Sequence, residues 1–255
     1  MSAAFSNWPV ALEAACATTT LFRRVHVLEA IASTQDAPET RDAQPGTIVT
    51  AWRQTAGRGR FGRQWADTAS AGVAATFVVD TQPAERLALA GAIGAAGAAE
   101  RALGRRVGIK WPNDIVVDGR KLAGVLIEVR GARTCIGIGI NCTQERFDGD
   151  LESRATSLRM LGARADRLEV LVSLIAALDH ALTAPDERLV DSFLERDALR
   201  GTRALFATPH GPVEGEVRSI DPMRGLVVRM ASGEQFLPAA STSVAEWAIH
   251  RSAGG

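Results

Sequence analysis

The segment KWPNDIVVDGRKLAGVLIE, residues 110–128, predicts consecutive strands joined by tight turns. Pro112 keeps the residue before it extended, because the proline ring disfavours a helical conformation there. The Asn113-Asp114 pair that follows is typical of a turn. Residues 116–121 (VVDGRK) then surround an Asp-Gly pair, which is a strong short-range signal for a β-hairpin. We therefore expect strand pairing to organise this part of the fold.

The same segment contains every lysine in the protein. Only two of the 29 basic side chains are lysines, Lys110 and Lys121, and tyrosine is absent. Such a bias is typical of codon usage, but arginine cannot replace lysine where the chemistry needs a compact ammonium group. The predicted hairpin would place the two lysines near each other on adjacent strands. The pair therefore indicates a candidate site, although two surface lysines beside a tight turn would fit the same pattern.

Patterns outside this segment predict an α+β fold with a mixed sheet. Short β-rich runs between turn residues predict strands at residues 21–30, 47–52, 73–80, 107–111, 114–117, 123–129 and 135–140. Capping residues and the helical spacing of apolar side chains predict helices at residues 35–40, 84–103, 166–182 and after Pro185.

The chain divides into three parts by composition. Residues 1–20 are rich in Ala and Thr and weakly patterned, which predicts a loosely docked lead-in. Residues 21–200 contain the long helices and most of the strands, and are expected to form the main domain. Residues 201–255 contain short β-like runs separated by Gly, Pro and Asp, which is typical of a small barrel or sandwich.

Charge and cysteine content exclude several classes of protein. The 29 basic and 29 acidic side chains cancel, whereas a protein that coats nucleic acid normally has a basic excess, so no DNA binding is expected. No uncharged apolar run is long enough to span a membrane. The three cysteines, Cys16, Cys135 and Cys142, form no C-x-x-C pair, which favours reduced thiols in a cytoplasmic protein.

The segment Gly57-Arg58-Gly59-Arg60-Phe61-Gly62-Arg63 matches the pattern G-x-G-x-x-G. A dinucleotide-binding fold would need a helix that opens at the third glycine, but a strand pattern follows here instead. Alternating Gly and Arg suit a different use, because glycine lets the backbone approach a ligand and guanidinium groups bind carboxylate or phosphate oxygens. The segment therefore predicts an anion-binding lid, with a solvated cationic surface loop as the alternative.

A second glycine pattern lies in the strand at residues 136–141 (IGIGIN). Alternate glycines weaken a strand, since they offer no side chain for packing. They therefore indicate that a ligand or another backbone comes close to this strand.

Four segments, in this order and spacing, give the chain its resemblance to a known family: QTAGRGRFGRQW (54–65), KWPNDI (110–115), GRKLAGVLIE (119–128) and GIGIN (137–141). Together they resemble the biotin protein ligases, and the Ser33-Thr34 pair and residues 155–158 (ATSL) fit the same family. The resemblance runs from about residue 25 to the end. It implies a mixed-sheet, biotin/lipoate ligase-like catalytic domain followed by a small SH3-like β-barrel.

The resemblance also implies an activity. Enzymes of this family join biotin and ATP, with Mg²⁺, into biotinyl-5′-AMP and pyrophosphate, and then transfer biotin to a lysine of an apo biotin carboxyl carrier protein, releasing AMP. Biotin and ATP are then substrates, and no tightly bound prosthetic group is expected. Catalysis is expected to depend on Lys121 and Arg60.

The same resemblance assigns the other site residues. Biotin is expected to bind at the following residues: Ser33, Thr34, Gln54, Gly57, Arg58, Arg60, Lys121 and Gly124. ATP is expected to bind at a second set: Arg60, Arg63, Trp65, Lys110, Asn113, Asp114 and Asn141. Asp114 is also a candidate Mg²⁺ ligand.

Three alternative functions fit the sequence less well. A lipoate–protein ligase would need an R-R-x-S-G-G-G-type loop and a following H-D, which this sequence lacks. A biotin-dependent regulator would need a helix-turn-helix, and only 32 residues without that pattern precede Ser33, so the ligase-only form is expected. An inert biotin-binding module would not need the ATP-side residues. The sequence does not distinguish a monomer from a homodimer. Residues 239–247 differ from the C-terminal sequence that is usual in this family.

Overall fold

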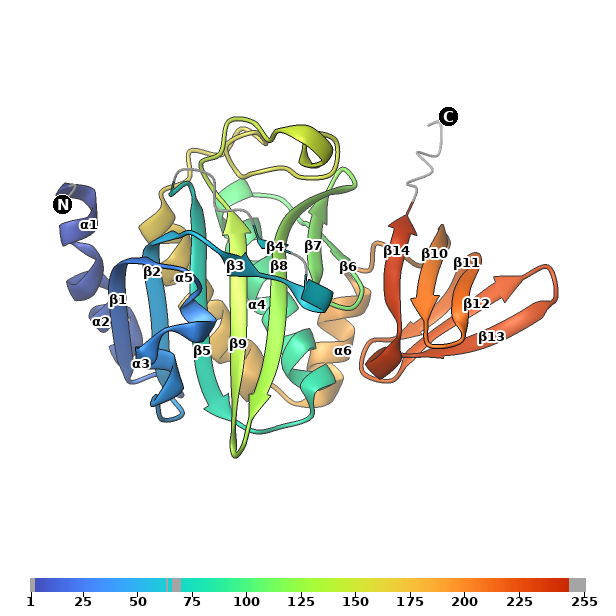
Figure 1. Ribbon diagram of the computed structural model, residues 1–255, viewed down its shortest axis with the longest axis horizontal. Coiled ribbons are helices and arrows are strands. Elements are labelled where there is room, and N and C mark those ends of the chain that lie inside the picture. The colour runs from blue at the N-terminus through green and yellow to red at the C-terminus, as the bar shows by residue number, and fades with distance from the viewer. Residues whose placement is uncertain (1–2, 63, 66–69, 248–255) are drawn as a thin grey trace.

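The computed structural model describes residues 3–62, 64–65 and 70–247. A seven-stranded mixed sheet forms the larger part of the molecule, and a five-stranded antiparallel sheet forms the smaller part (Figure 1). Only β1 and β2 pair in parallel within the large sheet, and its other neighbours are antiparallel. The predicted α+β fold class is therefore confirmed.

The large sheet runs in the order β1-β2-β5-β9-β8-β7-β6. Its strands are β1 (Arg24–Ile31), β2 (Thr47–Gln54), β5 (Gly72–Asp80), β6 (Gly108–Lys110), β7 (Asp114–Val117), β8 (Arg120–Arg130) and β9 (Arg133–Asn141). The helices and 3₁₀ turns around it are α1 (Ala3–Ser6), α2 (Trp8–Ala17), η1 (Thr34–Asp36), α3 (Pro38–Arg41), α4 (Ala84–Leu103), η3 (Gly149–Leu151), α5 (Arg167–Thr183) and α6 (Asp186–Leu194).

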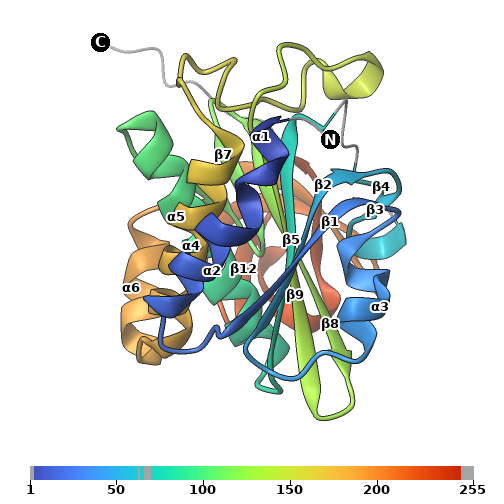
Figure 2. The ribbon, with the colours of Figure 1, turned by 90° about the vertical axis from the view of Figure 1, so that its left-hand side faces the viewer.

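Helices α4 and α5 pack together against one face of this sheet, as Figure 2 shows. The glycines of α4 permit the close approach: a Cβ at Gly91 would lie 2.8 Å from Val125 Cγ1, and one at Gly94 would lie 2.9 Å from the Cα of Leu178. The predicted bounds of α4 are confirmed at both ends. The opposite face of the sheet is left available for a site.

Helix α2 corrects the prediction of a loosely docked lead-in. Trp8, Leu12 and Cys16 are buried at a spacing of four residues, and the Trp8 ring lies 5.3 Å from that of Trp52. The guanidinium of Arg167 stacks over both rings. The prediction was wrong because the segment has only a narrow apolar stripe among many Ala and Thr residues. Such a helix gains its stability from tertiary packing, which composition does not show.

The Asp-Gly hairpin is confirmed between β7 and β8. Asp118 and Gly119 both have positive φ, 47° and 74°, as a two-residue turn of this type requires. One detail was wrong: Lys110 and Lys121 do not lie on adjacent strands. Lys110 ends β6 and Lys121 is the second residue of β8, so that β7 runs between them.

The small sheet runs in the order β13-β12-β11-β10-β14. Its strands are β10 (Arg203–Thr208), β11 (Gly211–Asp221), β12 (Gly225–Met230), β13 (Gly233–Pro238) and β14 (Ser243–Trp247), with η4 (Ala239–Ser241) before the last. The sequence did not predict β14. The indole of the fully buried Trp111 donates a hydrogen bond to the Pro222 carbonyl at 3.1 Å, which joins the small sheet to the turn between β6 and β7.

The cysteines and the helices bear on two further expectations from the sequence. All three cysteines are buried free thiols, as expected. Among the residues that the structure describes, none of the helices has the length and apolar character needed to cross a bilayer.

Candidate active site

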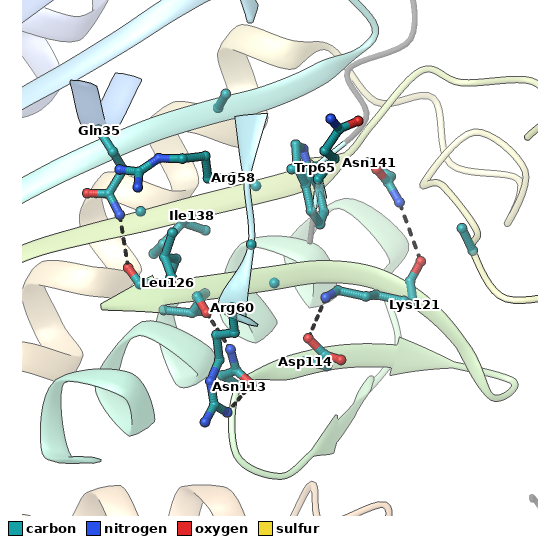
Figure 3. Close-up of a pocket in the computed structure, with 18 of the residues that line it drawn as sticks. Gln35, Arg58, Arg60, Trp65, Asn113, Asp114, Lys121, Leu126, Ile138 and Asn141 are labelled. Carbon is teal, nitrogen blue, oxygen red and sulfur yellow. Dashed lines mark hydrogen bonds and ion pairs between the residues drawn. The ribbon is translucent and has the colours of Figure 1, made fainter. Parts of the chain in front are cut away.

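A cavity of about 420 Å³ lies on the sheet face opposite α4 and α5, beneath the loop that contains β3 (Gly57–Arg58), η2 (Arg60–Gly62) and β4 (Gln64–Trp65) (Figure 3). Twelve of the predicted site residues line it: Ser33, Thr34, Gln54, Arg58, Arg60, Trp65, Lys110, Asn113, Asp114, Lys121, Gly124 and Asn141. Gly57 lines a smaller hollow beside it. Arg63 lies outside the described residues.

One end of the cavity is built from buried, neutral hydrogen-bonding groups. Gln54 ends β2, and its Oε1 accepts from the backbone N–H of Thr34 at 2.9 Å and from the Thr34 hydroxyl at 3.3 Å. The Thr76 hydroxyl donates to the Thr34 hydroxyl at 2.9 Å, and Ser33 is buried beside them. This end, the neutral end, therefore offers fixed donors and acceptors without charge.

Gln35 belongs to the neutral end, although the sequence analysis did not single it out. It is 3% exposed, and its Nε2 lies 3.5 Å from the Leu126 carbonyl while its Oε1 has no hydrogen-bond partner among the described residues. A Cβ at Gly137 would lie 2.9 Å from Gln35 Nε2. An acceptor buried without a partner costs free energy, so this oxygen is available to a ligand N–H. Its position next to Ser33-Thr34 was the only signal for it.

The other glycine of β9 makes room for Trp65. A Cβ at Gly139 would lie 2.5 Å from the Trp65 ring, and one at Gly124 would lie 3.4 Å from it. The sequence predicted that a ligand or another backbone approaches this strand, but the groups that lie against its two glycines are the side chains of Gln35 and Trp65. Trp65 presents an aromatic ring to the cavity from the loop above.

The other end of the cavity is charged, and Asp114 lies at its centre. Lys121 Nζ lies 2.6 Å from one carboxylate oxygen of Asp114, and Lys110 Nζ lies 3.4 Å from the other. Burial alone would raise the pKa of Asp114, but the two ammonium groups outweigh it and hold the pKa below its usual range. Asp114 is therefore ionised and holds both lysines of the protein at the cavity wall.

Lys121 has a closely defined environment. Its Nζ lies 5.6 Å from the centre of the Trp65 ring, and a Cβ at Gly124 would lie 2.9 Å from that same Nζ. Its backbone is fixed by a hydrogen bond from its N–H to the Arg154 carbonyl at 2.8 Å. The ammonium group thus lies at the charged end of the cavity, next to Asp114 and near the Trp65 ring (Figure 3).

Two asparagines hold the surrounding segments in place. Asn113, in the turn before β7, donates to the Val125 carbonyl and accepts from Arg60 Nη1 at 3.3 Å. Asn141, at the end of β9, donates to the Thr156 carbonyl at 2.9 Å. Arg60 therefore reaches across the cavity from the loop to the β6–β7 turn.

Cations dominate the lining of the cavity. Among the described lining residues, Arg58, Arg60, Lys110, Lys121 and Arg154 are basic, whereas Asp114 alone is acidic. The Arg154 guanidinium has no ion-pair or hydrogen-bond partner among the described residues, and the sequence analysis missed it. This excess of positive charge suits a polyanionic ligand. The site as a whole therefore suits two ligand groups held side by side, one neutral and polar and the other anionic.

Comparison with known proteins shows the class of the protein. A model of the "Biotin/lipoate A/B protein ligase family" matches residues 27–144. The bifunctional ligase/repressor BirA of Bacillus subtilis is 33% identical over 228 residues, which are 81% of this chain and 69% of that protein. The biotin–[acetyl-CoA-carboxylase] ligase of Paracoccus denitrificans is 32% identical over 222 residues, 77% of this chain and 91% of that protein.

A solved structure gives the same result. The biotin protein ligase from Aquifex aeolicus in complex with biotin and ATP superposes with a TM-score of 0.79 at 25% identity, covering 88% of this chain and 99% of that one. The chain belongs to the biotin/lipoate A/B protein ligase family, as an enzyme of the biotin protein ligase type.

Proposed function

We propose that this enzyme uses ATP to attach biotin to one lysine of a biotin carboxyl carrier protein, through biotinyl-5′-AMP. The observation that carries the proposal is the division of a single cavity into a neutral and a cationic end, with Lys121 beside Asp114 at the cationic end. Biotin has a neutral ureido ring and a carboxylate tail, and ATP is a polyanion. Each end of the cavity therefore suits one part of the reacting pair.

In this proposal the neutral end binds the ureido ring. The ring has two N–H donors and one carbonyl acceptor, and it needs partners for all three. Ser33, Thr34 and Gln54 supply them in a buried setting, and the unpartnered Oε1 of Gln35 adds an acceptor. A rigid, fully hydrogen-bonded pocket favours a ligand of matching pattern, because an analogue without these groups leaves buried partners unpaired.

The charged end brings two anions together for the first step. A carboxylate oxygen of biotin attacks the α-phosphorus of ATP, the bond from that phosphorus to the bridging oxygen breaks, and pyrophosphate leaves. Arg60 and the Lys121 ammonium neutralise the reacting carboxylate and phosphate and stabilise the negative charge that grows on the phosphoryl oxygens. Trp65 and Asn141 flank the space proposed for the nucleoside.

Asp114 fits poorly as a Mg²⁺ ligand in this arrangement. Both of its oxygens are engaged by ammonium groups, and no second carboxylate lines the cavity among the described residues. Magnesium commonly binds through substrate phosphates and waters, with one or two carboxylates. We infer that Mg²⁺ enters with the ATP phosphates, and that Asp114 serves to hold the two lysines.

In the second step the neutral amine of the carrier lysine attacks the acyl carbon of biotinyl-AMP. The bond from that carbon to the phosphate oxygen breaks, AMP leaves, and the amine loses a proton as the amide forms. Lys121 is placed to stabilise the AMP phosphate as it departs. The mixed anhydride is already activated, so that the protein needs no covalent nucleophile of its own.

The test combines the protein, ATP and Mg²⁺ with an apo-carrier domain and either biotin or lipoate. Mass spectrometry of the carrier lysine is expected to find biotin attached and no lipoate. Attachment of lipoate would instead support the lipoate–protein ligase alternative. An unmodified carrier with both acids would support an inert biotin-binding module.

A further inference from the structure

A cluster of four alternating charges lies at the outer edge of the cavity, next to the neutral end. It consists of Asp36, Arg58, Glu128 and Arg130, and we call it the charge cluster. Arg58 Nη2 lies 2.9 Å from an Asp36 oxygen and 2.8 Å from a Glu128 oxygen. Arg130 Nη2 lies 2.7 Å from Glu128 and 3.6 Å from Asp36. Each arginine therefore contacts both carboxylates.

The cluster joins three separate parts of the chain. Arg58 belongs to β3 in the loop over the cavity, Asp36 ends η1, and Glu128 and Arg130 lie on β8. Arg130 Nη1 also donates to the Gln35 carbonyl at 2.7 Å, which ties the cluster to the backbone of the neutral end. In Figure 3 the Arg58 side chain accordingly lies next to Gln35, the residue before Asp36.

The loop is fastened on both sides of the cavity. Arg58 holds one side through the charge cluster, and Arg60, two residues later, contacts Asn113 on the other side at 3.3 Å. Gly57 fixes the first turn of the loop, because a Cβ there would lie 2.3 Å from Gln54 Nε2 and 2.9 Å from the Trp65 carbonyl. A ligand beneath the loop would be enclosed while both fastenings hold.

We propose that the charge cluster is a latch that keeps the loop closed over the activated intermediate, and that Asp36, Glu128 and Arg130 are positioning residues that act through Arg58. The intermediate is biotinyl-AMP, so this inference rests on the proposed function. Retention matters because water destroys a mixed anhydride that escapes. Exposed ion pairs are individually weak, and the side chains of Arg58 and Asp36 are 41% and 44% exposed. The latch therefore depends on the combined stabilisation from all four charges.

The test compares release of biotinyl-AMP with its synthesis in Glu128→Gln and Asp36→Asn. Each variant is expected to release the intermediate about threefold to tenfold faster, the range expected for loss of roughly 1 kcal/mol from an ion-pair network. Synthesis in a single turnover is expected to change by less than about twofold. Asp186→Asn is the matched control, because it removes an equally short ion pair to Arg86, 2.7 Å long and away from the cavity.

A double-mutant cycle separates a latch from a general structural effect. In an Arg58→Met background, Asp36→Asn is expected to have no further effect on release, because the cluster acts through Arg58. Wild-type release is also expected to accelerate with salt, and release from Glu128→Gln to depend on salt much less. Additive effects, or unchanged release in both acidic variants with normal synthesis, would overturn the latch.

A second readout does not depend on the proposed function. Limited trypsin digestion of the ligand-free protein is expected to cut next to Arg58 and Arg60 faster in Glu128→Gln than in the wild type or in Asp186→Asn. Equal cutting rates would count against the latch. A wild type that makes no biotinyl-AMP would instead reject the proposed function, and the digestion would still decide about the latch.

Discussion

The two ends of the cavity use opposite means to define a ligand. The neutral end is closed by hydrogen bonds among Thr34, Gln54 and Thr76, all of them buried. At the charged end, Asp114 holds two lysines, and Arg154 stays without a partner among the described residues. The neutral end is held by hydrogen bonds within the protein, whereas the charged end carries an excess of positive charge that a ligand must neutralise.

This difference separates recognition from activation. A preformed neutral site discriminates by matching donors and acceptors. A cationic site gains most where charge develops during reaction. Changes at the neutral end should therefore affect biotin affinity, whereas changes at the charged end should affect ATP affinity or the chemical step.

The largest effect is expected at the charged end, from Lys121→Arg. The ammonium group lies against Gly124 and beside Trp65, so the wider guanidinium has no room in the same position even though the charge is kept. Biotinyl-AMP formation in a single turnover should fall by about 10²- to 10³-fold, the range for loss of one preorganised donor. Lys110→Arg, the matched change of the other lysine, should lose much less. A wild-type rate in Lys121→Arg would refute the role given to this residue.

The next effect is expected at the neutral end, from Thr34→Val. This change keeps the shape but removes the hydroxyl that joins Thr76 to Gln54, at a cost of about 1–3 kcal/mol for a buried bond. The KM for biotin should rise by roughly tenfold or more, with the KM for ATP nearly unchanged. Thr50→Val, which removes a buried hydroxyl bond to the Ala74 carbonyl, is the control for general destabilisation. Equal rises in the KM values for biotin and ATP would contradict the proposed division of the cavity.

A smaller effect, on the KM for ATP and not on the KM for biotin, is expected from Arg154→Ala. This guanidinium lines the cavity, and Arg154 directly precedes Ala155, which pairs with Lys121. Removing it should raise the KM for ATP by about threefold to tenfold, as expected for one exposed charge-assisted contact, and leave the KM for biotin unchanged. Steady-state kinetics with each substrate varied in turn decides this. A selective effect on biotin would contradict the assignment.

The smallest effect is expected in the pH dependence of stability. Because the pKa of Asp114 is lowered in the folded protein, its ionised form stabilises the fold above the unfolded value of about 4, and that stability is lost as the pH falls through the folded pKa. Urea unfolding should therefore show a steeper loss of stability below about pH 4 in the wild type than in Asp114→Asn. Parallel curves would mean that the ion pairs to the two lysines do not stabilise the fold.

The sequence was informative wherever the signal was local. The Asp118-Gly119 hairpin and helix α4 depend on turn chemistry and helical spacing, and both were predicted correctly. The motif residues also gather at one cavity, except for Gly57, which lines the smaller hollow beside it, and Arg63, which lies outside the described residues. The binding roles assigned to them stay predictions until the experiments above are done.

What the sequence did not reveal depends on contacts between distant segments. Arg58 meets Asp36 across 22 positions and Glu128 across 70, and no local pattern connects them. Helix α2 gains its order from Trp52 and Arg167, which lie far along the chain. Lys110 and Lys121 were expected on adjacent strands, and the error arose because the turn at Trp111–Asn113 inserts β7 between them.

The most direct test of the divided cavity is a crystal structure with a non-hydrolysable analogue of biotinyl-AMP. The ureido ring should lie within about 3.2 Å of the polar groups of Ser33, Thr34 and Gln54. The phosphate substitute should contact Lys121 Nζ, and the adenosine should lie on the side of Trp65 and Asn141. An analogue bound in the reverse direction, or with its ring away from Thr34, would contradict the account.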